Sequence, residues 1–386
     1  RQQAHLTAPA DPDIGRKALE GGSTPVGRIM QRLGVAPADL ADRLGVDRAA
    51  VETLLERPRP APVVMLDAED ALAPTAEAAR HGREAAVEVL SMPAGSVVPR
   101  SLRFFRPPGV ASGATARELL PVLWGLAERS DAGSFPLDGI VIPKIEQPEE
   151  VDLVDDMLGT AEKTLGIEVG SLRTALMIES GAGITQLDEI ARRSTDRICA
   201  LIFGLADYSA DLGLAAIRNE HPAAEWARAR IVSVAAAVGV PAIDGMTLDY
   251  PVADPGLDAA ANRERFLERM ALVFDDAVHA RDAGMLGKWV GHPAQLFAVL
   301  LAFDLGMSDE ALEAEAAKLV AYDDSIREDG TGATIIDGVM SDRATDRHAR
   351  VVLRHAVAMG RFEPARAFEL GVIDEAELAE LGPDTQ

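Results

Sequence analysis

Residues 173–213 read RTALMIESGAGITQLDEIARRSTDRICALIFGLADYSADLG, and they contain the clearest indication of the fold. Two apolar runs of strand length, Thr174–Ile178 and Ile198–Phe203, flank the segment Ile184–Arg193, which has the spacing of a helix. Continuous rather than alternating apolar runs are typical of parallel strands that are buried on both faces. The stretch therefore predicts a strand–helix–strand unit of a parallel sheet.

The same pattern recurs along the chain. We expect eight strands, at Ala4–Ala8, Val63–Leu66, Val97–Phe105, Leu137–Ile142, Thr174–Ile178, Ile198–Phe203, Pro241–Ile243 and Lys288–Val290. Eight strands that are each followed by a helix predict an α/β fold, a (β/α)8 TIM barrel. We expect the barrel in residues 1–306, with a helical insertion at 14–57 after the first strand. Residues 307–386 would form a helical C-terminal extension.

The composition limits the classes of partner. A net charge of −24 over 386 residues disfavours nucleic acids and anionic membranes, which bind basic surfaces. The insertion resembles a helix-turn-helix, but its second helix is acidic and poor in cations, which favours a packed insertion over a DNA reader.

No apolar run approaches the roughly 20 residues of a membrane span, and no signal peptide opens the chain. The single cysteine, Cys199, lies in an apolar run and indicates a core position. We expect a soluble cytoplasmic protein.

Acidic residues follow the two strands of the opening stretch. Glu179 comes directly after the first strand, and Asp207 follows the second after Gly204 and two further residues. Both carboxylates would meet at one rim, because the carboxyl ends of parallel strands open on the same face. Two carboxylates with little basic charge nearby suit Mg²⁺, which keeps open positions for water and substrate oxygens. The alternative is that each acid caps the helix that follows it, and spacing alone does not separate the two.

Two further groups of charged residues follow neighbouring strands. The second strand ends in an acidic cluster, Asp67, Glu69 and Asp70, and the third carries three arginines, Arg100, Arg103 and Arg106. The cluster predicts a polar network around the rim. An arginine there suits two-point binding of a substrate carboxylate or an enolate, or a salt bridge to the acidic cluster. Lys144, after the fourth strand, could form a Schiff base, although a metal-binding carboxylate pair makes that mechanism redundant.

These residues carry a resemblance to a known family. The chain resembles the citrate lyase beta-subunit-like superfamily, also called the HpcH/HpaI aldolase/citrate lyase family, over most of its length. The matching pieces, in order, are LDAEDALAP (66–74), the arginine-bearing third strand, IPKIE (142–146), MIESGAG (177–183), FGLADYSADLG (203–213), GKWVGHPAQ (287–295) and IIDGVMSD (335–342).

The resemblance implies roles for individual residues. It implies Mg²⁺ ligation by Glu179 and Asp207, and binding of the substrate oxygens and the forming enolate by Arg103. It places Gly204 and the acidic cluster (Asp67, Glu69, Asp70) around the substrate. It also implies that Asp342 acts as a general acid or base in the site of an adjacent subunit, in a homotrimer or hexamer.

The chemistry implied is carbon–carbon bond cleavage or formation of the Claisen or aldol type. The expected substrates are a β-hydroxyacyl thioester, such as a malyl-, citramalyl- or citryl-CoA-like compound, and its products, an acyl-CoA thioester and a 2-oxo acid. Two alternatives stay open. One is a metal-dependent aldolase acting on a free hydroxy-oxo acid, since the first strand lacks the Arg-Ser and Pro-Gly elements of thioester members. The other is a non-catalytic barrel scaffold that carries an interaction module.

Overall fold

The computed structural model describes residues 2–93, 100–130, 135–193, 196–329, 333–336 and 339–381. The chain separates into two compact units, one from Gln2 to Phe303 and the other from Asp304 onward. Each unit has its own hydrophobic core.

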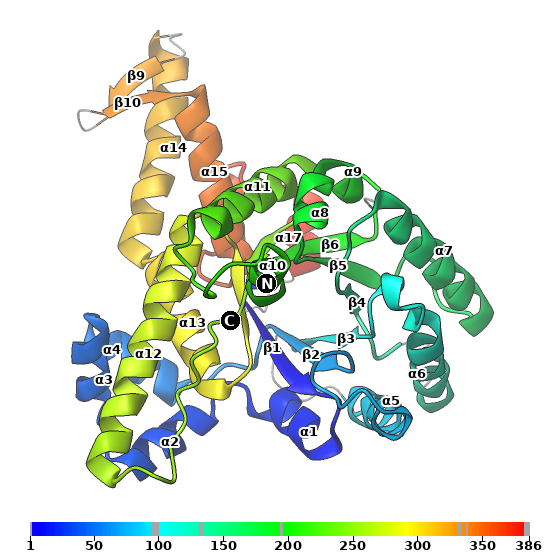
Figure 1. The fold of residues 1–386 in the computed structure, drawn as a ribbon. Helices are drawn as coiled ribbons and strands as arrows, with labels where there is room; N and C mark the ends of the chain where they lie inside the picture. The colour runs from blue at the N-terminus through cyan, green and yellow to red at the C-terminus, as the bar shows by residue number, and fades with distance from the viewer. Residues whose placement is uncertain are drawn as a thin grey trace. The chain divides into compact units, whose positions relative to one another are not determined.

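The first unit is a closed barrel of eight parallel strands, each paired with its sequence neighbours and β1 with β8 (Figure 1). The strands are β1 (Ala4–Pro9), β2 (Val63–Asp67), β3 (Leu102–Arg106), β4 (Gly139–Ile142), β5 (Arg173–Ile178), β6 (Ile198–Phe203), β7 (Ala242–Asp244) and β8 (Gly287–Val290). The predicted (β/α)8 TIM barrel is confirmed. The third strand differs in its bounds: it begins at Leu102 and includes Arg106, whereas residues 97–99 of the expected strand lie outside the described residues.

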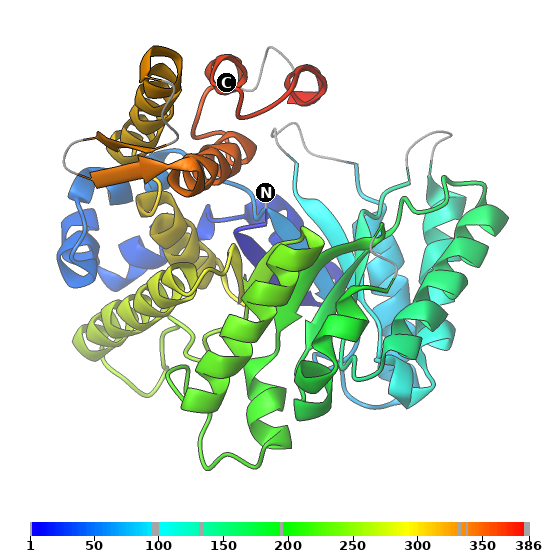
Figure 2. The same ribbon diagram turned by 90° about the horizontal axis from the view of Figure 1, so that it is seen from above.

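Helices surround the barrel, as the view from above shows (Figure 2). They are α1 (Pro12–Gly21), α5 (Ala76–Leu90), α6 (Thr115–Arg129), α7 (Pro148–Leu165), α8 (Gly181–Thr185), α9 (Leu187–Ala191), α10 (Leu205–Asp211), α11 (Pro222–Val238), α12 (Ala259–Asp282) and α13 (Pro293–Leu305), with a 3-10 turn η1 (Val110–Ser112) before α6. The single helix expected over Ile184–Arg193 is instead the pair α8 and α9. They are separated at Gln186, whose backbone is not helical (φ −96°, ψ 7°).

Strand alternation sorts the barrel side chains into two cores. One set fills the barrel and includes Val63, Met65, Phe104, Met177 and Ile202. The residues between them pack outward against the helices and form a second core. Because successive side chains point to opposite faces of a strand, this alternation also fixes which residue at each strand end faces the barrel mouth.

The insertion consists of three short helices, α2 (Pro25–Leu33), α3 (Pro37–Leu44) and α4 (Arg48–Glu56). It packs beside the barrel, with α3 against α12, and Arg263 on α12 pairs with Asp39 on α3 at 2.8 Å. Its apolar side chains, such as Val26, Leu40 and Val51, are buried, and each such residue contributes about 2 kcal/mol of burial free energy. The preceding helix α1 packs on β1, β2 and α5, so it is a barrel helix rather than part of the insertion.

The second unit is a small helical body with a β-hairpin. Its elements are α14 (Asp309–Asp329), β9 (Ala333–Ile336), β10 (Val339–Asp342), α15 (Arg343–Ala358), α16 (Pro364–Glu369) and α17 (Glu375–Leu381). Its core includes Leu319, Leu353 and Phe362. In the described part of the chain, no helix combines the length and the hydropathy that crossing a membrane requires.

Candidate active site

The floor of the candidate site is an ion pair between the last residues of β2 and β3. Asp67 and Arg106 are register partners in the parallel ladder and continue the inward-facing rows of Met65 and Phe104. Arg106 Nε donates a hydrogen bond to Asp67 Oδ1 at 2.8 Å, and Nη2 donates to Oδ2 at 2.5 Å. The guanidinium carbon also lies 5.0 Å from the ring centre of Trp289. A two-point pair of this kind fixes orientation as well as charge, so one positive charge is held at the centre of the barrel mouth.

Glu179 lies in the same layer, directly after β5. Its side chain continues the inward row of Ala175 and Met177, and the residue is 3% exposed. The main-chain N–H of Lys144 donates to Glu179 Oε1 at 2.8 Å. Burial, and next the negative charge of Asp207, raise the pKa of Glu179 to about 8. The surrounding residues therefore do not fully compensate the negative charge of ionised Glu179. This is expected of a side chain whose charge is balanced by a bound cation.

Gly204 and Asp207 complete the far side of the rim. Gly204 follows β6, and a Cβ there would lie 2.4 Å from Glu179 Oε2, so only glycine leaves room for this carboxylate. Asp207 lies in the first turn of α10, with 46% of its side chain exposed. The structure thus brings Glu179 and Asp207 to one rim, as the sequence predicted from parallel strand ends, and Gly204 lies against Glu179.

Glu69, Asp70 and Lys144 form an ionic group above this floor. Lys144 Nζ donates to Glu69 Oε1 at 2.6 Å and to Asp70 Oδ1 at 3.2 Å, and it lies 4.0 Å from Asp207 Oδ1. Burial raises the pKa of Glu69. Burial disfavours the charged form of Lys144, but its hydrogen bond to Glu69 and the surrounding negative charges outweigh this and raise its pKa. A Schiff-base lysine needs a lowered pKa, so this environment disfavours that alternative.

Arg103 is not part of this group, and the expectation that it contacts substrate oxygens needs correction. Its side chain points outward, between the barrel and α5. There its guanidinium donates to the carbonyl oxygens of Leu90, Met92 and Pro93 at 2.6, 2.5 and 3.1 Å. It caps the carboxyl end of α5, a favourable place for a cation. Arg106, three residues later and on the opposite face of the strand, occupies the position that we expected for Arg103.

Asp342 lies in the second unit, at the start of α15. Its Oδ1 accepts hydrogen bonds from the main-chain N–H groups of Ala344 and Thr345 at 2.9 and 3.0 Å, and the Thr345 hydroxyl accepts one from the Asp342 N–H. This is a capping box. It gives Asp342 a structural role, and its proposed role as a general acid or base remains a prediction.

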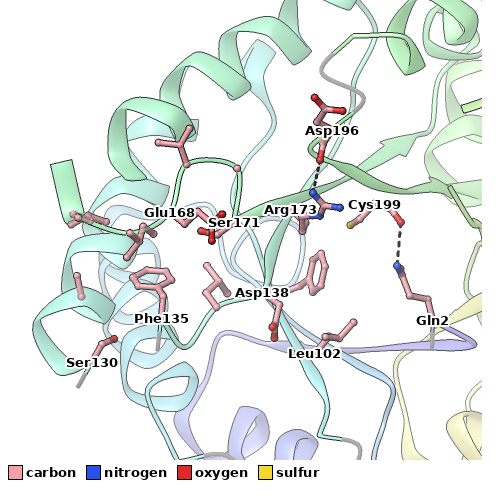
Figure 3. Close-up of a pocket in the computed structure, with 18 residues that line it drawn as sticks. Gln2, Leu102, Ser130, Phe135, Asp138, Glu168, Ser171, Arg173, Asp196 and Cys199 are labelled. Atoms are coloured by element: carbon pink, nitrogen blue, oxygen red, sulfur yellow. Dashed lines mark hydrogen bonds between the residues drawn. The ribbon is translucent and has the colours of Figure 1, made fainter. Parts of the chain in front are cut away.

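A cavity of about 1210 Å³ lies at the opposite end of the barrel (Figure 3). It is lined by the first residues of several strands and by the loops that precede them, among them Gln2, Leu102, Asp138, Arg173 and Cys199. Cys199 is only partly buried, at the edge of the core inside the barrel. Burial raises the pKa of its thiol to about 12, which disfavours a nucleophile. The carboxylates at the carboxyl rim do not line this cavity, so it is separate from the candidate site.

The residues at the rim fit a magnesium ion. Carboxylate oxygens are its preferred protein ligands. Lys144 N–H binds Glu179 Oε1, and no other residue that the structure describes donates a hydrogen bond to Glu179 Oε2. A cation would also relieve the mutual repulsion of Glu179 and Asp207. Among the described residues, no group of three or more His, Cys, Asp or Glu side chains is arranged to hold a metal. The expected ligand pair, Glu179 and Asp207, therefore remains a prediction.

Comparisons with known proteins identify the family to which the chain belongs. A family model described as Domain of unknown function (DUF6986) matches residues 28–383. An L-malyl-CoA/beta-methylmalyl-CoA lyase of Rhodobacter capsulatus is 30% identical over 60% of this chain and 71% of its own length. A citrate lyase beta subunit of Haemophilus influenzae is 27% identical over 60% of this chain and 72% of its own.

Solved structures share the fold. A citrate lyase from Burkholderia xenovorans, 22% identical, superimposes with a TM-score of 0.66 and covers 96% of both chains. The CitE protein of Mycobacterium tuberculosis, in complex with magnesium, acetoacetate and coenzyme A, is 20% identical with a TM-score of 0.56, covering 92% of this chain and 98% of its own. At these identities the likeness supports the barrel fold alone. Taken with the family match and the relatives, it leads to one conclusion: the chain belongs to the DUF6986 family, within the citrate lyase beta-subunit-like superfamily.

Proposed function

We propose that this protein is a Mg²⁺-dependent carbon–carbon lyase that interconverts a β-hydroxyacyl-CoA thioester with an acyl-CoA and a 2-oxo acid. The observation that carries the proposal is the convergence of Glu179, with its pKa raised to about 8, and Asp207 at a rim whose floor holds Arg106. The relatives support the class of reaction, since those at 30% identity are malyl-CoA lyases. The CitE structure that shares the fold contains both magnesium and coenzyme A.

Each rim residue has a part in this chemistry. Glu179 and Asp207 would hold the ion, which when bound polarises the oxo acid and offsets charge. In the cleavage direction a base takes the proton of the substrate hydroxyl, the carbon–carbon bond breaks, and its electrons form the enolate of the acyl thioester. Arg106, fixed by Asp67, presents positive charge to that enolate, and such preorganised charge stabilises a transition state strongly. The enolate then takes a proton at carbon to give the acyl-CoA.

We further propose that Asp342 of a neighbouring copy supplies this acid or base function, in a homotrimer or hexamer. The β9–β10 hairpin that leads to Asp342 exposes 74% of Ile335 and 63% of Met340. Large apolar side chains exposed together on a hairpin suit burial against another chain. We also propose that the protein is cytoplasmic.

The test is a direct assay. Protein stripped of metal is incubated with glyoxylate and acetyl-CoA or propionyl-CoA, with and without Mg²⁺, and the hydroxyacyl-CoA product is measured by mass spectrometry. We expect product only with Mg²⁺ and none with Glu179→Gln. Product formation at full rate in a chelator would contradict the metal dependence. A failure of every oxo-acid and thioester pair to react would contradict the lyase.

A further inference from the structure

Lys144 has the only left-handed backbone among the non-glycine residues that the structure describes, with φ of 56°. It follows Pro143 at the end of β4, in the loop that reaches the barrel mouth. A residue with a Cβ is strained in this conformation, which glycine adopts freely. A non-glycine residue kept in it at a functional rim indicates a use for its side chain.

That conformation allows Lys144 to make two contacts at once. Its main-chain N–H donates to Glu179 Oε1 at 2.8 Å, while its ammonium reaches the other side of the rim and donates to Glu69 at 2.6 Å. The loop is held close to its neighbour, because a Cβ at Gly109 would lie 2.9 Å from the carbonyl oxygen of Pro143. The backbone thus orients one carboxylate while the side chain binds another.

Glu69 and Asp70 each lie between two cations. Lys144 Nζ is 2.6 Å from Glu69 Oε1 and 3.2 Å from Asp70 Oδ1. Arg106 is 3.3 Å from the other oxygen of Glu69 and 3.7 Å from the other oxygen of Asp70. All four carboxylate oxygens therefore face a positive charge. Burial opposes the charged form of Asp70, but the charges of Arg106 and Lys144 outweigh burial and lower its pKa.

This pairing has a consequence for the cation that the proposed function requires. Lys144 Nζ lies 4.0 Å from Asp207 Oδ1, so its partners Glu69 and Asp70 are close to the expected ligand pair. Released from the ammonium, these two carboxylates would be further oxygen ligands beside Glu179 and Asp207. A cation with four carboxylates would be bound tightly and would have fewer positions open for substrate oxygens.

We propose that Lys144 is a positioning residue that keeps the cation site limited to two carboxylates, holding Glu179 by its main-chain N–H and withdrawing Glu69 and Asp70 with its ammonium. The inference rests on the proposed function, since it requires a cation at Glu179 and Asp207. Lys144 would determine which carboxylates bind the cation, and Glu179 and Asp207 would bind it with or without the ammonium. Lys144 acts through the carboxylates that it holds, not on the substrate.

The test is the affinity of metal-stripped protein for Mg²⁺ and Ca²⁺, measured by calorimetry on Lys144→Met. Loss of the ammonium is expected to tighten Mg²⁺ binding about fivefold, the effect of roughly 1 kcal/mol for a partly exposed charge. Ca²⁺ should gain more than Mg²⁺, because it takes six to eight oxygens. Lys144→Arg keeps the charge and should restore the parent affinities. Turnover should fall in Lys144→Met although the metal binds more tightly, a split that a merely structural lysine would not cause.

Two further variants keep the result interpretable. Lys318→Met removes an ammonium of similar exposure that is 2.6 Å from Glu315, and it should leave both affinities unchanged. Lys144→Gly relieves the left-handed backbone while it removes the ammonium, so it should fold at least as well as Lys144→Met and bind metal as tightly. If the parent binds Mg²⁺ and both Lys144→Met and Lys144→Gly bind it equally or more weakly, the role of Lys144 is overturned while the proposed function stands. Absence of Mg²⁺ binding in the parent would instead overturn the proposed function.

Discussion

Arg106 and Asp67 are register partners on adjacent strands and form an ion pair at the base of the barrel mouth. Two hydrogen bonds of 2.8 and 2.5 Å join them. Only 5% and 3% of the two side chains are exposed. Breaking a buried pair by removing one partner leaves an uncompensated charge. The position of the Arg106 guanidinium therefore depends on Asp67 and on the alignment of β2 with β3.

The two arginines of β3 should behave differently when each is replaced by lysine. Arg106→Lys loses the two-point geometry and should lower kcat about 100-fold, with the fold preserved. Arg103→Lys loses contacts with carbonyl oxygens at the end of α5 and should cost about 1–3 kcal/mol of unfolding free energy, with kcat near the parent value. Steady-state kinetics and urea denaturation measure the two effects. A larger kcat loss in Arg103→Lys than in Arg106→Lys would contradict our assignment.

Glu179→Gln should stabilise the metal-free protein in a pH-dependent way. The folded-state pKa of Glu179 is raised from 4.5 to about 8, so the folded protein binds this proton more tightly than the unfolded chain. The resulting stability is fully present below pH 4.5, is lost as the pH rises, and is gone above about pH 8. The variant lacks this loss, so its advantage in the free energy of unfolding, read from thermal denaturation curves, should grow between pH 5 and pH 8 and reach on the order of 4 kcal/mol. Added Mg²⁺ should stabilise the parent and not the variant. An advantage that does not change with pH would argue against a proton on Glu179.

Gly204→Ala should weaken the cation site without unfolding the barrel. The new Cβ would meet Glu179 Oε2 at 2.4 Å and Glu179 Cβ at 2.5 Å, so the whole Glu179 side chain would have to shift. We expect Mg²⁺ affinity to fall about tenfold, in the range seen when the support of a metal ligand is disturbed. Gly27→Ala is the matched control, because a Cβ on Gly27 meets nothing within 4 Å, and it should leave affinity unchanged. Unaltered Mg²⁺ binding in Gly204→Ala would remove Glu179 from the ligand set.

Mixing two inactive variants should restore activity if Asp342 acts in a neighbouring copy. Asp342→Asn and Glu179→Gln should each be inactive alone. Unfolded together and refolded, they form mixed oligomers in which about a quarter of the sites combine an intact Glu179 with an intact Asp342 from the adjacent chain. Recovery of activity in the mixture, together with a trimer or hexamer by sedimentation, is the expected outcome. A monomer, or a mixture without activity, would leave Asp342 as a helix cap only.

Much of the fold followed from the sequence because buried parallel strands leave a simple pattern. The continuous apolar runs located the strands, and the positions of Glu179 and Asp207 after two of them placed both at one rim. The choice between Arg103 and Arg106 failed for a definable reason. The two residues lie three apart and so on opposite faces of a strand, and the strand was expected to end at Phe105. Placing its end at Arg106, just before Pro107 and Pro108, would have put Arg106 at the mouth.

The role of Lys144 could not be read from the sequence. Its two contacts depend on a φ of 56°, and the sequence Pro-Lys-Ile does not specify a left-handed residue. Its ionic partners also come from a different strand end, 74 and 75 residues away. Only the closed barrel brings these residues together.

The partly buried thiol of Cys199, in the lining of the cavity, allows a second cysteine to be labelled selectively. Cys199 is the single cysteine of the chain, and its pKa of about 12 leaves almost no thiolate at neutral pH. A cysteine introduced at Ile335 or Met340, which are 74% and 63% exposed, would therefore react with a maleimide dye much faster than Cys199. Fluorescence from that dye would test whether another chain covers the hairpin, with little background from Cys199.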